Sequence, residues 1–296
     1  MPLLRWPVLS SASVPVLRTI TMDSKGGGDF RRIQSAVNLV PHGNREWAGG
    51  YREKVTIPRE KGYILLEGGS HKNTVIYFDD YAHGSTDDLM RRGADAMGTY
   101  ETTTLRVYAD DFVARDIAFT NTHNGVNKSK VTQALAALVD DTICDNTGRH
   151  YFHECFIKGG VDFIFGYARS IYDGCTLVSN IPLRHGRRAG WVTAHARRHA
   201  GDPGGTGRQY LGRAWNKYAT IVYYHVSMSS VVVPQGWAPW HVGRETNDVL
   251  FAEVGCTGQG SNMAGRVPWE KHLTETEVEK FVDMSFIDDG WLSKQP

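Results

Sequence analysis

Residues 112–119 read FVARDIAF, residues 151–157 read YFHECFI and residues 171–177 read IYDGCTL. The three segments are similar to one another, and Cys155 and Cys175 occupy equivalent places in the second and third. A period of about twenty residues, with one or more short strands in each unit, is typical of a solenoid protein. The repeat therefore predicts a parallel β-helix.

Other strand-like segments extend the pattern through most of the chain. They are short and separated by Gly, Asn and Asp, and they include residues 63–66, 74–78, 104–108, 191–193 and 220–226. A β-sandwich remains an alternative, because Asn124-Gly125 could form a hairpin turn between antiparallel strands. The fold class that we expect is all-β, with the parallel β-helix as the preferred architecture.

Both ends of this β-rich region have helical patterns. Ile33 and its neighbours form an apolar face within residues 31–40, after the Gly-rich residues 26–28. These glycines predict a turn rather than a phosphate-binding loop, because no Gly-Lys-Ser/Thr follows. A second helix is expected over residues 273–291, with a capping-type start at Thr274. Short helices at the two ends would cover the open coils of a solenoid.

Composition limits the class of partner. The chain has 296 residues and a formal net charge of +1, so neither nucleic acid nor a membrane is expected as a partner. No run reaches the roughly 18 apolar residues of a membrane span. The four cysteines form no CxxC pair, which argues against zinc, and they are interpreted as buried thiols with disulfides as the alternative. Residues 1–18 resemble a weak or truncated signal peptide.

Two aspartates are candidates for chemistry. Asp162 is a charge inside the apolar run GVDFIFG, residues 160–166, and Asp141 precedes it by about one coil of the expected solenoid. Adjacent coils lie about 4.8 Å apart, so the two carboxylates could be neighbours on one face. Such a pair suits a nucleophile and a proton donor, and its mutual repulsion would raise the pKa of one member. The alternative is that both acids are solvated in loops.

At these residues the chain resembles the plant pectin methylesterase (pectinesterase) family, from about Gly26 to Trp291. The resemblance rests on many short motifs in the right order: GYREKV at 50–55, FTNT at 119–122, QALA at 133–136, DT at 141–142, DFIFG at 162–166, LGRAW at 211–215, PQGWAPW at 234–240 and GRVPW at 265–269. It implies a single-stranded, right-handed parallel β-helix over residues 19–296 and hydrolysis of the methyl esters of homogalacturonan to pectate and methanol. It also implies secretion to the plant cell wall.

The same resemblance implies partners and residue roles. Pectin is the expected substrate, proteinaceous pectinesterase inhibitors are further partners, no metal or organic cofactor is used, and we expect a monomer. Asp162 would attack the ester carbonyl, and Asp141 would protonate the departing methanol and then activate water. Arg213 would keep Asp162 ionised and oriented, which suits a permanent planar charge. Gln133 would donate to the oxyanion. Substrate contacts are expected from Thr104, Gln133, Arg213, Trp215 and Trp237.

Structural roles remain open for several of these residues. Arg213 could instead form a surface salt bridge, Trp215 and Trp237 could be core residues, and Gln133 could be a strand-end amide.

Two departures from the family pattern favour a different function. Gln133 and Asp141 are close together in the chain, as if about one coil were missing between them. Asp140 stands where the family has its second oxyanion-hole Gln, and an ionised carboxylate there would repel the oxyanion unless its pKa were strongly raised. The alternative function is therefore a catalytically impaired, pectin-binding homologue. A pectate lyase is a third interpretation, but it would need a calcium-binding acidic cluster beyond the aspartate pair.

Overall fold

Each repeat segment folds into two strands that meet at a one-residue corner. In the computed structural model these corners are Asp116, Glu154 and Gly174, with φ values of 56°, 51° and 61°. A single residue in the left-handed region turns the chain sharply, so that each coil contributes strands to two sheets. The six strands are β6 (Phe112–Arg115), β7 (Ala118–Asn121), β9 (Arg149–His153), β10 (Phe156–Gly159), β12 (Arg169–Asp173) and β13 (Thr176–Ser179).

The structure describes residues 20–39, 49–81, 101–123, 136–139, 149–160, 162–166, 169–179, 190–195, 209–214, 216–288 and 290–291. The remaining strands in these ranges are also short. They are β1 (Gly49–Arg52), β2 (Val55–Ile57), β3 (Leu65–Glu67), β4 (Thr74–Phe78), β5 (Leu105–Val107), β8 (Ala137–Val139), β11 (Ile164–Gly166), β14 (Gly190–His195), β15 (Gln209–Ala214), β16 (Thr220–Tyr224), β17 (Trp237–Ala238) and β18 (Leu250–Val254).

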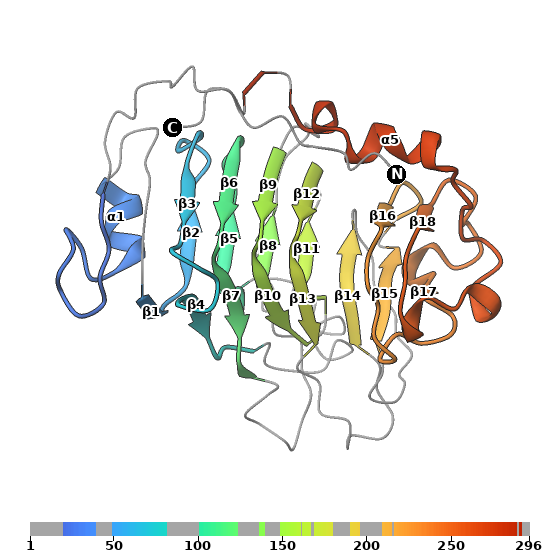
Figure 1. Cartoon of the computed structure of the whole chain (residues 1–296), viewed down its shortest axis with the longest axis horizontal. Helices are drawn as coiled ribbons and strands as arrows, with labels where there is room; N and C mark the ends of the chain where they lie inside the picture. Colours follow the sequence, from blue (N-terminus) through green and yellow to red (C-terminus); the bar gives the residue numbers. More distant parts are fainter. Residues whose placement is uncertain are drawn as a thin grey trace, which may run out of the picture.

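The strands stack into sheets that run along the molecule (Figure 1). The strand orders are β1-β4-β7-β10-β13, β2-β5-β8-β11-β14-β15-β17 and β3-β6-β9-β12, with β16 and β18 forming a further pair. Every strand pair within the described residues is parallel, which excludes a β-sandwich joined by hairpins. The predicted right-handed parallel β-helix is confirmed.

Coil length varies along the helix. Phe156 pairs with Thr176 in the next coil. The offset between these two residues equals the offset between the repeat segments, which confirms the period seen in the sequence. Phe156 also pairs with Ala118 on its other side, and that step is almost twice as long. The step from Ala137 to Ile164 is intermediate in length. The period of the repeat segments therefore describes one step of the solenoid, and the other steps contain longer loops.

Side chains that point into the coils stack upon their equivalents in the next coil. The rings of Phe152 and Tyr172, on β9 and β12, are parallel with centroids 4.8 Å apart. Phe112 and Phe119 continue this column towards the N-terminal coils. Cys155, Cys175 and Cys256 are free thiols, as predicted, but Cys175 and Cys256 are only half-buried, whereas Cys155 is buried. Cys144 lies outside the described residues.

The N-terminal helix α1 (Ile33–Leu39) is close to the predicted range and packs against β2. Its buried face contains Ile33, as expected. Glu53, from the GYREKV motif, accepts hydrogen bonds from the backbone N–H groups of Ile33 and Gln34, at 2.7 and 3.2 Å. The motif glutamate therefore caps the first turn of the helix. The preceding Gly-rich residues form a turn around Asp23.

The second predicted helix is shorter than expected. α5 (Glu275–Val282) begins with a capping box between Thr274 and Glu277, as predicted, but it ends at Val282. The chain continues through the 3₁₀ turn η4 (Met284–Phe286) and lies across the outside of β3, β6, β9 and β12, where Trp291 is 1% exposed. The expectation of a helix to residue 291 is wrong, because the last apolar residues pack on a sheet face. None of the helices described is long and apolar enough to cross a membrane.

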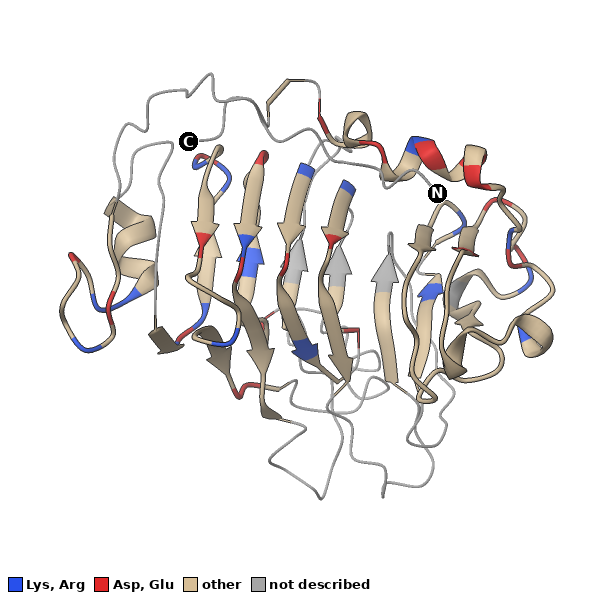
Figure 2. Ribbon diagram, in the orientation of Figure 1, with Lys and Arg blue, Asp and Glu red and all other residues tan. Residues whose placement is uncertain are grey.

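Charged residues of both signs are interspersed along the described strands and loops (Figure 2). This distribution agrees with the net charge of +1. The remaining short elements are the 3₁₀ turns η1 (Trp240–Val242), η2 (Gln259–Ser261) and η3 (Met263–Gly265).

Candidate active site

A buried ion pair joins two strands of the longest sheet. Asp162 lies just before β11 with φ at 50°, and its backbone N–H donates to the carbonyl of Trp191 at 2.8 Å. Arg213 lies on β15, and β14 separates the two strands. The Arg213 Nε donates to Asp162 Oδ1 at 2.9 Å, and Nη2 donates to Oδ2. Asp162 and Arg213 are 1% and 4% exposed, so a surface salt bridge is excluded for Arg213.

Two opposing effects act on the Asp162 carboxyl. Burial raises the pKa of Asp162, and the charge and hydrogen bonds of Arg213 oppose that rise. A bidentate guanidinium fixes the plane of a carboxylate as well as favouring its ionised form. The structure brings Asp162 and Arg213 together, and the geometry is that of an oriented carboxylate.

Two tryptophans border Arg213 that were not assigned a role from the sequence. The Arg213 Cζ lies 3.3 Å from the ring centroid of Trp240 and 4.1 Å from that of Trp191. Trp240 is the second tryptophan of the PQGWAPW motif, and Trp191 opens the segment that became β14. The only sequence signal for a role of Trp240 was its place in this motif. Trp237 belongs to the same motif, so the signal did not distinguish the two residues.

Two residues that the resemblance names as substrate contacts are buried. Trp237 is 1% exposed, and its ring packs on Phe251 and Tyr223 with centroids 4.6 and 5.8 Å away. Thr104 is fully buried, and its hydroxyl donates to the carbonyl of Thr120 at 3.2 Å. Trp237 packs in the core. The substrate contacts expected of Trp237 and Thr104 stay predictions.

Four other predicted site residues, Gln133, Asp140, Asp141 and Trp215, lie outside the described residues. In the sequence, Gln133 precedes β8 and Asp141 follows it, and β8 is the sheet neighbour of β11. The register of these strands pairs Val139 with Gly166. Because Asp141 lies outside the described residues, its proximity to Asp162 and its role stay predictions.

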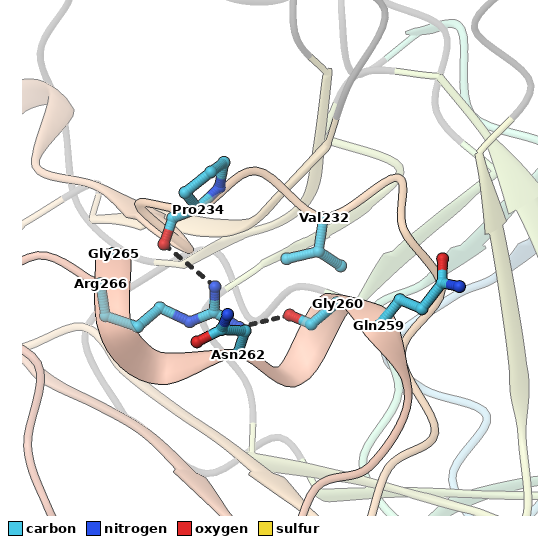
Figure 3. Close-up of a pocket in the computed structure, with 7 residues that line it drawn as sticks. All are labelled: Val232, Pro234, Gln259, Gly260, Asn262, Gly265 and Arg266. Atoms are coloured by element: carbon cyan, nitrogen blue, oxygen red, sulfur yellow. Dashed lines mark hydrogen bonds between the residues drawn. The ribbon is translucent and has the colours of Figure 1, made fainter.

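A polar cavity of about 170 Å³ lies elsewhere, near the C-terminal coils (Figure 3). At this cavity Arg266 uses all five of its N–H donors: two engage the Glu253 carboxylate, and three engage the carbonyl groups of Val233, Pro234 and Gly260. All donors of this guanidinium are therefore used within the protein. The arginine of the GRVPW motif ties together the segments around residues 233, 253 and 260.

The described residues contain no group of three or more His, Cys, Asp or Glu placed to hold a metal ion. The site consists of a carboxylate, a guanidinium and aromatic rings. The fold is therefore a helix of stacked coils whose candidate site is centred on a buried carboxylate.

The chain belongs to the pectinesterase family, since the family model described as Pectinesterase matches residues 19–290. It is 36% identical to probable pectinesterase 29 of Arabidopsis thaliana over 94% of this chain and 89% of the relative. It is also 36% identical to pectinesterase QRT1 of the same plant, over 94% of this chain and 79% of the relative. Among solved structures, the pectin methylesterase from carrot matches with a TM-score of 0.66 at 27% identity, covering 94% and 96% of the two chains. The family inferred from the sequence motifs is confirmed.

Proposed function

We propose that this chain hydrolyses the methyl esters of homogalacturonan, with Asp162 as the nucleophile. The observation that carries the proposal is the buried, bidentate pair of Asp162 and Arg213 on the longest sheet, at positions that match the family motifs. Secretion to the plant cell wall, where this substrate occurs, is part of the proposal.

The reaction has two balanced steps. An Asp162 oxygen adds to the ester carbonyl carbon, and collapse of the intermediate breaks the bond to methoxide, which leaves as methanol with a proton from Asp141. Water then attacks the acyl-enzyme and gives one proton to Asp141. The intermediate collapses to ionised Asp162 and the galacturonic acid carboxyl group, which releases its remaining proton to solvent. No cofactor enters either step.

The described geometry supports the first step in two ways. Arg213 donates to both Asp162 oxygens, which favours the ionised form and holds the carboxylate in one plane. Asp162 is almost fully buried, so an ester that reaches it reacts away from most bulk water, where fixed dipoles stabilise charge more strongly. Gln133 is proposed to donate to the oxyanion, a contribution worth about 3 kcal/mol of barrier in comparable sites.

Two sequence features favour the alternative of a protein that binds pectin without turnover. Asp140 would place a negative charge beside the oxyanion, and the chain between Gln133 and Asp141 is too short for a full coil. A carboxylate at this position stabilises an oxyanion only when it is protonated.

The test is methanol release from highly methyl-esterified pectin by the parent chain and by its Asp162→Asn and Asp140→Gln variants. Asp79→Asn is the matched control, because Asp79 forms an exposed pair with Arg52 far from the site in sequence. Release that is lost in Asp162→Asn and kept in Asp79→Asn supports the esterase. A silent parent whose activity appears in Asp140→Gln identifies Asp140 as the lesion. Silence in all variants, with retained pectin binding, supports the binding homologue.

A further inference from the structure

The guanidinium of Arg213 lies between two indole rings that belong to neighbouring coils. Trp191 is on β14 and Trp240 begins η1, shortly after β17, and β14 and β17 pair with the two sides of β15. The ring centroids are 4.1 and 3.3 Å from the Arg213 Cζ. Two indoles this close to one carbon would overlap if they shared a face, so they occupy opposite faces of the planar guanidinium.

This arrangement leaves only the edge of the guanidinium for hydrogen bonding. That edge points at Asp162, with Nε and Nη2 each donating to one carboxylate oxygen. The flat faces of a guanidinium are weakly hydrated and stack well on aromatic rings, whereas its long stem has several rotatable bonds. The rings therefore remove the alternative orientations of Arg213 and exclude water from its faces.

Trp191 contacts both members of the ion pair. Its carbonyl accepts the Asp162 backbone N–H at 2.8 Å, while its ring covers Arg213. Behind it, the Tyr210 ring is stacked at a centroid distance of 5.8 Å and an angle of 10°. The Trp191 indole N–H is buried without a hydrogen-bond partner in the described part of the chain, so the ring is present for its face and not as a donor.

We propose that Trp191 and Trp240 are positioning residues for the esterase reaction, which hold Arg213 in the one orientation that engages both oxygens of Asp162. The inference rests on the proposed function. It states that the two rings determine in what fraction of molecules Asp162 is correctly oriented for attack. The rings act through Arg213 and do not touch the reacting atoms. Ordinary packing would require only apolar volume at these two positions, whereas positioning requires a flat face.

The variants Trp240→Leu, Trp191→Leu and the corresponding Trp→Phe changes separate these requirements. Leucine keeps apolar volume, and phenylalanine keeps an aromatic face. We expect kcat for methanol release to fall by about tenfold or more in each Leu variant with KM changed less than about threefold, and to recover in the Phe variants. Trp269→Leu is the control, since Trp269 packs on Phe251 and not on Arg213.

A double-variant cycle with Arg213→Lys tests whether the rings act through Arg213. Lysine cannot present a bidentate fork, so Trp240→Leu is expected to cost little further kcat in that background. Equal losses in both backgrounds, or an unchanged kcat in the Leu variants, would overturn the proposal. A higher KM at constant kcat would also overturn it and would make the rings sugar-binding surfaces.

A readout without turnover keeps this inference separate from the proposed function. The Arg213 Nε–H resonance, assigned by its loss in Arg213→Lys, is expected to exchange slowly with water in the parent and the Phe variants. It should exchange at least tenfold faster in the Leu variants. If the parent releases no methanol but this pattern holds, the esterase proposal fails and the positioning of Arg213 stands. Unchanged exchange in folded Leu variants would refute the positioning.

Discussion

At the scale of single residues, Arg213 decides whether Asp162 can remain ionised in a buried site. Burial raises the pKa of Asp162, and Arg213 is the cation that opposes this rise. Removing the cation leaves desolvation unopposed, and breaking a buried pair by deleting one partner typically costs about 3–5 kcal/mol at neutral pH. Without Arg213, the stability of the protein should therefore depend on pH in a defined direction.

We predict that Arg213→Gln makes the protein less stable as the pH rises from 4 to 8, relative to the parent. A group whose pKa is higher in the folded state contributes stability that is complete below its unfolded pKa and is lost as pH rises through the folded pKa. Activity would also require a higher pH, because Asp162 must be ionised to attack. Thermal denaturation across this pH range measures the first effect. In the double variant Arg213→Gln/Asp162→Asn, this additional loss of stability with rising pH should disappear. The same dependence of stability on pH in the single and the double variant would contradict the prediction.

Trp237 and Trp240 show why residue roles could be only partly predicted. The pair Asp162–Arg213 was expected from the family resemblance, and a charge in an apolar run needs a partner of opposite sign. The two tryptophans belong to one short motif, yet Trp237 is in the core and Trp240 stacks on Arg213. Which of them faces the site depends on the path of the chain after β17, a property of tertiary packing with no local sequence signal.

At the scale of elements, the corner residues determine where one strand ends and the next sheet begins. Gly174 has φ at 61°, and a Cβ added there would lie 2.6 Å from Glu154 Oε1 of the preceding coil. The equivalent corners, Asp116 and Glu154, carry side chains in the same backbone region. The backbone thus tolerates a side chain at a corner, but at a cost in conformational energy.

We predict that Gly174→Ala lowers the free energy of unfolding by about 1–2 kcal/mol, because an L-residue pays this much for the left-handed region. Gly174→Asn should cost less, since Asn visits that region more readily. Urea denaturation measures both changes. Gly69→Ala serves as the control, because a Cβ there meets no atom within 4 Å. Equal losses for Gly174→Ala and Gly69→Ala would mean that the corner is unstrained.

The repeat segments predicted the fold because each contains a whole corner with its two flanking strands. Residues 151–157 and 171–177 align at the same offset in the sequence and in the strand register. The register of β8 and β11 follows a longer step than that of the repeat segments. Loop length between coils is unconstrained by stacking, so a period measured at one step could not be carried to the next.

At the scale of the whole molecule, the C-terminal segment joins coils that are distant in sequence. Ile287 and Trp291 are both buried and pack on Leu65 and Val113 of β3 and β6. Arg169, which begins β12, donates to the Phe286 carbonyl at 3.1 Å. Because each coil otherwise contacts mainly its neighbours, a segment that crosses several strands of one sheet adds long-range cooperativity to a quasi-one-dimensional fold.

We predict that Trp291→Ala lowers the free energy of unfolding by about 3–5 kcal/mol, the usual cost of deleting a buried tryptophan ring. The loss should be local, because the ring lies over β3, β6, β9 and β12 and not over β16 and β18. Hydrogen exchange would therefore accelerate in β6 and β9 and stay unchanged in β18. Leu39→Ala, at a side chain that is 55% exposed, should leave both regions unchanged. Uniform acceleration in all sheets would instead mean that the segment stabilises the fold only as a whole, because local opening and global unfolding give different exchange patterns.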